Sequence, residues 1–513
     1  MDPLDLVKPA DFYVDGWENL DWLQELLEEK CAPHKITNLT ARPRRPGELW
    51  LLCCGIKGRK GFTRKLGDQQ KEGVKPKEGF MAAIRRIFIR WKDDPEGLPE
   101  SVVVKIPSPK TASEAWEKSQ AVKSDDLDDF GSKVITFLHY TESDAYSRLE
   151  GSGLQIPRVF MNRNVGSNNP KEFPVLVMED LSKYEIMDVL DGMNEAKLFS
   201  VVDFLVDLHF FSFHRDDLQS FGLTKEQSDV LGSFDDVVRG VCDKLPSQSP
   251  RHFKNIGLAR EAILGKGDWF NDYVEAFKSG EQPTVLTHGD LWTTNVLFQG
   301  DSVAGVIDWQ IAHPGSPTED LQHLLTLCCP VALRERLTEP LLLYYHQKLT
   351  QKFKANGESV PFSLEKLKVD LYDLTRSYTM AMSLFATGMW SISDVILNGK
   401  DEDRRLEECY SRAEALIDET LRHLVGLKIL LFTFAFDLRS FDPLDLTAAE
   451  TSLCLTVRRT LFQCCSCTLC LLSMSLYHHS RAYVEAAITL IFGCGSRQRV
   501  RRKDPLSLPA RGP

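Results

Sequence analysis

Apolar and polar residues along the chain follow two different spacings, and the change falls near residue 194. Before it, short runs rich in β-branched and aromatic residues predict strands, interrupted by one helix at about residues 133–149. The strands are expected at 82–91, 101–106, 156–160 and 173–178, with the first two forming a hairpin. This order of elements predicts a small α+β unit.

From residue 195 onward, apolar residues recur mainly at helical spacing. Helices are expected at 195–214, 258–278, 319–328, 333–354, 364–397 and 403–424. Three short strands, expected at 284–287, 295–298 and 303–307, are embedded among these helices. Near the N-terminus, residues 17–27 predict a short amphipathic helix, whereas the Arg-, Lys-, Gly- and Pro-rich residues 41–79 are expected to be an irregular insertion.

The composition is that of a globular protein, with 43% hydrophobic and 26% charged residues in a chain of 513. A net charge of −11 disfavours nucleic-acid binding, which needs clustered Lys and Arg. The first residues lack the basic and apolar regions of a secretory signal, so the 13 cysteines are expected to be reduced thiols. We therefore expect a cytoplasmic protein with no nucleic-acid partner and, for its core, no membrane partner.

The last part of the chain differs in kind. Residues 426–513 hold 11 Lys and Arg against 6 Asp and Glu, and they contain a cluster of cysteines. Cys467 and Cys470 form one C-x₂-C pair of the kind found in zinc sites, within an apolar run, 461–477, at the short limit for a membrane span. We expect a poorly ordered tail, with membrane association and then metal binding as the alternatives.

Polar residues beside the three central strands are of the types that phosphoryl transfer requires. This reaction needs a carboxylate near the acceptor hydroxyl, oxygen ligands for Mg²⁺ and positive charge on the nucleotide phosphates. Asp290 lies between two strands, Asn295 offers an amide oxygen, and Asp308 follows an apolar strand. A single Asp often only caps a turn, but the three together at this spacing indicate a site.

Three ordered motifs, Leu286–Asn295, Ile307–Gln310 and Pro317–Leu321, resemble the choline kinase-like family that includes ecdysteroid kinase-like proteins, within the aminoglycoside phosphotransferase group. The spacing is also similar to that of protein kinases, but Gly289 stands in place of their usual Arg. The resemblance covers roughly residues 75–425. It implies a protein-kinase-like fold with two lobes, ATP between them and a small-molecule hydroxyl as the acceptor.

The resemblance implies a role for each polar residue of these motifs. Asp290 is expected to be the catalytic base or the group that orients the acceptor hydroxyl, with His288 and Asp320 in supporting positions. Asn295 and Asp308 are expected to hold Mg²⁺.

The resemblance also implies the nucleotide-binding residues. Lys105 resembles the strand lysine that holds the α and β phosphates, and Glu142 the helix glutamate that pairs with it. A lysine that ends a strand is more often a solvated surface charge, and Asp144 is an alternative partner. The remaining residues are Gly79, Phe80 and Met81 in a turn over the phosphates, and Met178, Glu179, Asp180 and Leu181 in the hinge between the lobes.

Taken together, the sequence predicts an α+β, two-lobed chain. Its segments are an N-terminal helix with an irregular part (1–74), a small β-rich N-lobe (75–181), a larger, mainly helical C-lobe (182–425) and the tail (426–513). The expected function is transfer of the γ-phosphate of ATP to a hydroxyl of a small molecule of sterol-like or amino-alcohol type.

Two other functions compete with this one. No complete G-x-G-x-x-G loop precedes Lys105, so a pseudokinase that binds a nucleotide or metabolite without chemistry is the main alternative. A metal-dependent hydrolase would need more ligands than the neighbouring His313 and His323 supply. Trp292, Trp309 and Trp390 could line a pocket for a cationic substrate, although packing in the core is the simpler interpretation.

Overall fold

The computed structural model describes residues 20–42, 82–92, 96–107, 127–164, 173–219, 221, 225–263, 273, 277, 279–280, 282–397 and 401–440. The chain divides into two compact units, Met1–Leu427 and Lys428–Pro513, and the description below concerns the first. The expected phosphate-covering turn at Gly79, Phe80 and Met81 lies outside the described residues, and so does the cysteine cluster of the tail.

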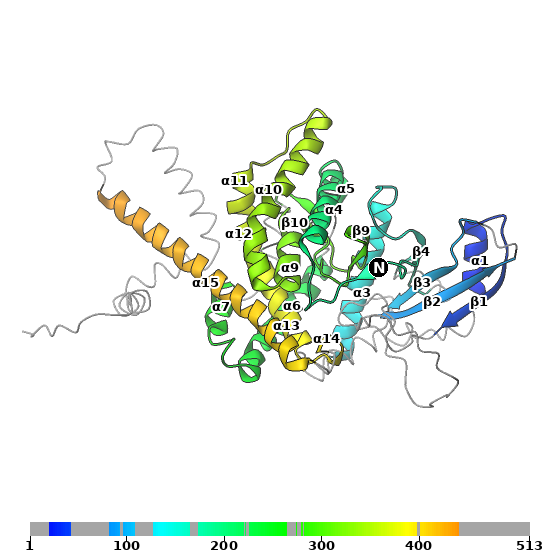
Figure 1. Cartoon of the computed structure of the whole chain (residues 1–513), viewed down its shortest axis with the longest axis horizontal. Coiled ribbons are helices and arrows are strands. Elements are labelled where there is room, and N and C mark those ends of the chain that lie inside the picture. The colour runs from blue at the N-terminus through cyan, green and yellow to red at the C-terminus, as the bar shows by residue number, and fades with distance from the viewer. Residues whose placement is uncertain are drawn as a thin grey trace, which may run out of the picture. The chain divides into compact units, whose positions relative to one another are not determined.

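The small lobe is built on a five-stranded antiparallel sheet (Figure 1). Its strands, in spatial order, are β1 (Ile36–Arg42), β2 (Ala82–Trp91), β3 (Ser101–Pro107), β5 (Val175–Glu179) and β4 (Val159–Arg163). The predicted hairpin is confirmed, with Ile84 of β2 opposite Lys105 of β3. Helix α1 (Asp21–Lys30) packs on one face of the sheet and α3 (Leu127–Leu149) on the other.

Strand β3 is buried along its whole length because both faces of the sheet are covered. Side chains alternate between the faces of a strand, so Val102 and Val104 contribute to the core shared with α1. Val103 faces the opposite way, into the core shared with α3 and the larger lobe. Lys105 has the same parity as Val103, and its side chain is therefore directed toward the space between the lobes.

Strand β1 was not predicted, and it changes the description of the N-terminal segment. Residues 36–42 pair with β2, and α1 buries Leu23, Leu26 and Leu27 against the same sheet. Both elements thus belong to the small lobe, whereas the expected boundary at residue 75 left them outside it. Among residues 36–40 of β1, whose burial the structure describes, only Ile36 is buried, so this sequence carries little strand periodicity and the pairing with β2 defines the strand.

The larger lobe is mainly helical, as expected. Its helices are α4 (Glu195–Phe213), α5 (Asp216–Gln219), α6 (Lys225–Gln248), α7 (Ile256–Ile263), α9 (Glu319–Cys328), α10 (Val331–Ala355), α11 (Leu364–Lys366), the π-helical turn η4 (Leu367–Leu371), α12 (Tyr372–Leu374), α13 (Arg376–Trp390), α14 (Asp394–Leu397) and α15 (Glu402–Ser440). Its short strands are β6 (Glu185–Ile186), β7 (Val285–Thr287), β8 (Val296–Gln299), β9 (Ser302–Val306) and β10 (His313–Gly315). They form the antiparallel sheets β6-β8-β9 and β10-β7.

Two helical regions of the larger lobe differ from the prediction. Helix α6 was missed, since Gly232, Gly240 and Pro246 lower the helical propensity of its sequence. The single helix expected at 364–397 is divided into α11, η4, α12, α13 and α14, and the carbonyl oxygen of Leu371, at the end of η4, accepts a hydrogen bond from the Thr318 hydroxyl at 3.0 Å. The fold class itself, a two-lobed α+β architecture, is confirmed.

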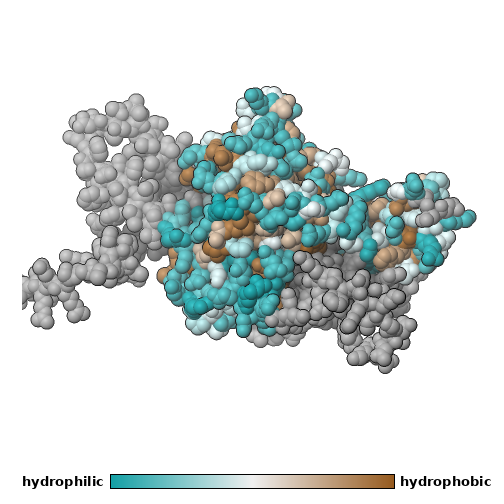
Figure 2. Space-filling view, in the orientation of Figure 1, coloured by the Kyte–Doolittle hydropathy of each residue, from teal (hydrophilic) through white to brown (hydrophobic). Residues whose placement is uncertain are grey.

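Polar and apolar surface is distributed as expected for a chain with large cores. Figure 2 shows mainly hydrophilic residues on the visible described face, with scattered hydrophobic patches. Among the helices that the structure describes, none has both the length and the apolar character of a membrane span.

Buried arginines attach α15 to the rest of the larger lobe. The Arg412 guanidinium, 4% exposed, donates hydrogen bonds to the carbonyl oxygens of Val189 (2.7 Å), Leu190 (2.7 Å) and Leu327 (2.6 Å). One side chain thus satisfies backbone acceptors from two other segments. Removing it would leave three buried carbonyl groups without these donors.

We expect Arg412→Met to lower the free energy of unfolding by about 3–5 kcal/mol, because buried acceptors lose their partners. Urea unfolding followed by tryptophan fluorescence measures the change. Arg404→Met is the matched control, since Arg404 is 58% exposed and pairs with Asp191 at the surface. Its effect should stay within about 0.5 kcal/mol, and equal losses in the two variants would contradict the assignment.

Candidate active site

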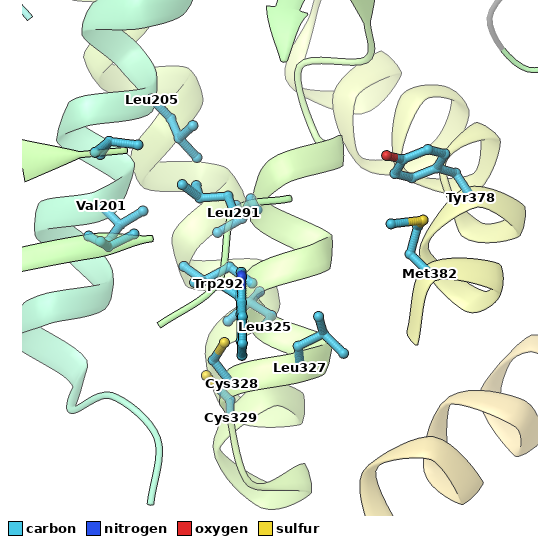
Figure 3. Close-up of a cluster of buried hydrophobic side chains, with 14 of the residues drawn as sticks. Val201, Leu205, Leu291, Trp292, Leu325, Leu327, Cys328, Cys329, Tyr378 and Met382 are labelled. Carbon is cyan, nitrogen blue, oxygen red and sulfur yellow. The ribbon is translucent and has the colours of Figure 1, made fainter. Parts of the chain in front are cut away.

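The loop between β7 and β8 carries Asp290, and the residues that follow Asp290 anchor it in the core. Leu291 and Trp292, 0% and 2% exposed, lie between α4 and α9 (Figure 3). The backbone N–H of Thr293 donates to Sγ of Cys328 at the end of α9 (3.3 Å). The side chain of Asp290, in contrast, is 27% exposed. The carboxylate is therefore presented at the surface of a firmly held loop.

Helix α9 holds the start of this loop through Asp320. The Asp320 carboxylate accepts hydrogen bonds from the backbone N–H groups of His288 (2.8 Å) and Gly289 (2.9 Å). Burial raises the pKa of Asp320, and the neighbouring Glu319 carboxylate raises it further, whereas these hydrogen bonds act in the opposite direction. The structure thus places Asp320 where the sequence predicted a bracing residue.

Gly289 occupies a position that no side chain fits. Its φ of 80° lies in the left-handed region, and a Cβ atom there would approach the carbonyl oxygen of Ile311 to 2.5 Å and Nδ1 of His313 to 3.2 Å. The hydroxyl of Tyr378 also donates to the Gly289 carbonyl oxygen (3.0 Å). The Arg that protein kinases carry here therefore has no room in this chain.

His288 connects the loop to the segment that carries Asp308. Nε2 of His288 is 2.9 Å from the carbonyl oxygen of Ile307 and must donate to it, so Nδ1 is the acceptor for the N–H of Asp290 at 3.3 Å. The ring is fully buried against Trp309, with the ring centroids 4.7 Å apart. Because both nitrogens are engaged, His288 is suited to support the loop rather than to act as a base.

Lys105 forms two buried ion pairs. Its Nζ lies 2.6 Å from Oε2 of Glu142 on α3 and 2.8 Å from Oδ1 of Asp308, and the three side chains are at most 9% exposed. The alternative of a solvated surface lysine is therefore wrong. The alternative carboxylate, Asp144, pairs instead with Arg148 at 2.9 Å.

The carboxyl group of Glu142 is strongly perturbed by its surroundings. Burial raises its pKa, Lys105 lowers it and Asp308 raises it, with a net value of about 7. Lys105, Glu142 and Asp308 come from β3, α3 and the segment after β9, so the ion pairs join the two lobes.

Sequence reasoning missed a neighbour of this cluster, Tyr146. Its hydroxyl oxygen accepts a hydrogen bond from the backbone N–H of Asp308 (3.3 Å). Asp308 is the one non-glycine residue with a positive φ, 72°, among those that the structure describes. Tyr146 follows Glu142 by four residues and thus lies on the same face of α3, a spacing from which it could have been found.

A small pocket opens at this point between the lobes. Strands of the small-lobe sheet, helix α3 and the segment after β9 supply its lining. The lining residues are Ile84, Val103, Lys105, Glu142, Tyr146, Met178 and Asp308. Its apolar residues belong to β2, β3 and β5, and its charged ones to the Lys105 cluster. The lining thus combines an apolar wall with a lysine and acidic groups.

The side-chain amide of Asn295 has one engaged atom and one oxygen without a hydrogen-bond partner among the described residues. Its amide Nδ2 donates to the carbonyl oxygen of Asp290 (2.9 Å), which directs Oδ1 away from that contact. Oδ1 is buried and has no hydrogen-bond partner among the described residues. An amide oxygen and the Asp308 carboxylate fit Mg²⁺, which needs few protein ligands. In the described part of the chain, no three His, Cys, Asp or Glu side chains cluster as a metal site of their own.

The hinge residues are placed between the sheet and the larger lobe. Met178 lines the pocket, but the carboxylate of Asp180 accepts a hydrogen bond from Ser101 and pairs with Arg86. The Asp180 side chain therefore ties the hinge to the sheet, and only its backbone is available to a nucleotide. Glu179 donates its N–H to the carbonyl oxygen of Arg158 (2.8 Å). The side chain of Leu181 is 4% exposed, and it packs against apolar residues that follow the loop carrying Asp290.

The tryptophans do not form a pocket for a cation. Trp292 and Trp390 are 2% and 4% exposed, and they stack on each other with ring centroids 5.3 Å apart and planes inclined by 24°. Trp309 is fully buried. Packing in the core is therefore the correct interpretation.

The antiparallel sheet with its buried strand lysine, the helix glutamate and the Asp-bearing loop define a protein-kinase-like, two-lobed fold. A family model described as DUF1679, Uncharacterized oxidoreductase dhs-27, matches residues 56–423, and the chain belongs to this family. The protein named Uncharacterized oxidoreductase dhs-27 from Caenorhabditis elegans is 25% identical over 339 residues. The match covers 64% of this chain and 40% of that protein, so the chain spans about two fifths of its relative.

Several solved structures are similar at low sequence identity. The gentamicin complex of APH(2")-IIa is 14% identical, with a TM-score of 0.35, and the match covers 76% of this chain and 97% of that chain. Choline kinase from Cryptosporidium parvum Iowa II is 14% identical, with a TM-score of 0.40, 72% of this chain and 92% of that chain being covered. With scores of this size, the fold assignment rests on the strand order and contacts described above.

We expect Gly289→Ala to disable the site, because its Cβ would collide with the Ile311 carbonyl group and force the backbone out of the left-handed region. The free energy of unfolding should fall by about 2–4 kcal/mol. Gly300→Ala is the control, since Gly300 also has a positive φ, 64°, but open space around its Cβ position. A larger loss at Gly300 than at Gly289, in urea unfolding, would contradict this account of the loop.

Proposed function

We propose that this chain is an ATP-dependent phosphotransferase whose acceptor is a hydroxyl group of a small molecule. The observation that carries the proposal is the contact of Lys105 Nζ with both Glu142 and Asp308, at 2.6 and 2.8 Å. This arrangement supports the proposal, because the lining of the pocket then offers a positive charge for the nucleotide phosphates and a carboxylate of the kind that binds Mg²⁺.

In the proposed reaction, the acceptor oxygen attacks the γ-phosphorus and the bond from this phosphorus to the β–γ bridging oxygen breaks. Asp290 orients the hydroxyl and takes its proton, and ADP leaves with the bridging oxygen. Lys105 holds the nucleotide phosphates, and Glu142 holds Lys105. Mg²⁺, bound by Asn295 and Asp308, would neutralise phosphate charge.

A small-molecule acceptor is favoured by the loop itself. Ile311 and His313 fill the space beside Gly289, so the loop lacks the Arg that is typical of protein kinases. The same Gly289 belongs to the motif that resembles choline kinase-like and ecdysteroid kinase-like proteins. Acceptors of sterol-like and amino-alcohol type are therefore the first to test.

An oxidoreductase is the competing function, since the related protein carries that name. Binding of a nicotinamide cofactor in a doubly wound fold requires a parallel sheet. All strand pairs among the described residues are antiparallel. The match covers only 40% of the relative, so the part that gives it this name can lie elsewhere in that protein. For the present chain, the described residues favour phosphoryl transfer.

A pseudokinase, the other competitor, is disfavoured by the polar residues themselves. Asp290, Asn295, Lys105 and Asp308 are all present; Lys105 pairs with Asp308 in the lining of the pocket, and Asn295 donates a hydrogen bond to the backbone of Asp290. A protein that only binds nucleotide has no need for the exposed carboxylate of Asp290.

The test is phosphate transfer from γ-labelled ATP, with Mg²⁺, to a metabolite extract and to a panel of sterols and amino alcohols. We expect Asp290→Asn to lower turnover by about 10²–10⁴-fold while Mg-ATP still raises the melting temperature. Asp308→Asn should lower both turnover and the stabilisation by Mg-ATP, because a neutral amide is a weaker metal ligand. Asn is preferred to Ala at position 308 because it tolerates the positive φ.

Asp207→Asn is the matched control, since Asp207 is 41% exposed and pairs with Lys352 on the surface. Its turnover should equal that of the wild type. Stabilisation by Mg-ATP without any labelled product would support the pseudokinase, and equal turnover in all four proteins would exclude the proposed mechanism.

A further inference from the structure

A buried histidine, His323 of α9, contacts the expected base directly. Its Nε2 lies 3.3 Å from Oδ1 of Asp290. The His323 side chain is 1% exposed and that of Asp290 is 27% exposed, so the contact is on the inner side of the carboxylate. From the sequence alone, His323 stood out only as a metal ligand for a hydrolase, and no metal cluster forms around it among the described residues.

The surroundings of His323 select its tautomer. An ionised carboxylate only accepts hydrogen bonds, so Nε2 must carry a proton to bond Asp290. Nδ1 is buried and has no hydrogen-bond partner among the residues that the structure describes. With the proton on Nδ1 instead, a buried N–H would lack an acceptor and two acceptors would face each other. Nε2 of His323 thus carries a proton, which it donates to Oδ1 of Asp290.

His323 lies on α9, the same helix that holds the backbone of the loop carrying Asp290. Asp320 and His323 are three residues apart on α9 and therefore share one face of the helix. Asp320 binds the backbone N–H groups of His288 and Gly289, and His323 contacts the side chain of the next residue, Asp290. One helix face therefore fixes three consecutive residues, first by their backbone and then by the carboxylate itself.

We propose that His323 is a positioning residue that holds Oδ1 of Asp290 and thereby turns Oδ2 toward the acceptor hydroxyl. Among the described residues Oδ2 has no hydrogen-bond partner, so it is available to the substrate. The proposal rests on the proposed function, because it assigns to Asp290 the role of base. The bond acts on orientation in the reacting complex, so it should affect turnover more than nucleotide binding.

The test compares two amides of different reach. In His323→Gln the amide nitrogen comes close to the position of Nε2, whereas in His323→Asn it reaches only as far as Nδ1. We expect His323→Asn to lower kcat for phosphate transfer from Mg-ATP by about tenfold or more, with the KM for ATP changed less than about twofold. His323→Gln should restore most of kcat. The acceptor used is whichever compound of the panel above is phosphorylated by the wild type.

His209→Asn is the control for shortening a buried histidine in the same lobe. His209 is fully buried and its Nδ1 lies 2.8 Å from the hydroxyl of Tyr345. Its variant should lower the melting temperature with kcat unchanged in the folded fraction. Equal loss of kcat in His323→Gln and His323→Asn, or none in either, would overturn the proposal.

Imidazole nitrogen NMR of the histidine-labelled chain provides a second measurement if His323→Asn does not fold. The His323 signals are assigned by their absence in His323→Gln, and they should report Nε2–H and shift in Asp290→Asn. An Nδ1–H tautomer, or no shift, would overturn the proposal. A wild type that transfers no phosphate to any acceptor contradicts the proposed function instead, since the NMR result does not depend on turnover.

Discussion

The arrangement of the two lobes depends on the burial of a single positive charge. An ammonium group at 9% exposure is stable only if carboxylates replace its water, and Lys105 meets two of them. Glu142 lies 37 residues away along the chain and Asp308 lies 203 residues away. The ion pairs therefore fix α3 and the end of β9 relative to β3. Without both partners, the lysine would have to leave the site or lose its charge.

The second constraint is the frame that α9 provides for the loop of Asp290. Contacts from Asp320, His323 and Cys328 follow the loop from its first residue to Thr293. At the start of the helix, Glu319 is fully buried and lies 3.1 Å from Nε2 of His313. Burial alone would lower the pKa of His313, but the Glu319 carboxylate raises it overall. The site is thus built on a buried support held by hydrogen bonds and ion pairs, as catalysis by positioning requires.

Several parts of the fold and the site followed from local patterns in the sequence. The hairpin that carries Lys105 was predicted because β-branched runs flank a turn, and α9 was predicted with its observed ends, Glu319 and Cys328. Strand β1 and helix α6 were not, since their stability comes from pairing and packing with distant elements. The turn at Gly79, Phe80 and Met81 lies outside the described residues, so that part of the nucleotide site stays a prediction.

The sequence by itself determined which residue types are present for the chemistry, since the spacing of Asp290, Asn295 and Asp308 is a property of the chain. It could not decide whether Lys105 is a surface charge or a buried one, because that depends on α3 and the larger lobe covering the face of the sheet to which Lys105 points. Nor could it show that His323 meets Asp290, 33 residues earlier. Such contacts are decided only in the tertiary structure, where helix packing brings together side chains that no local periodicity relates.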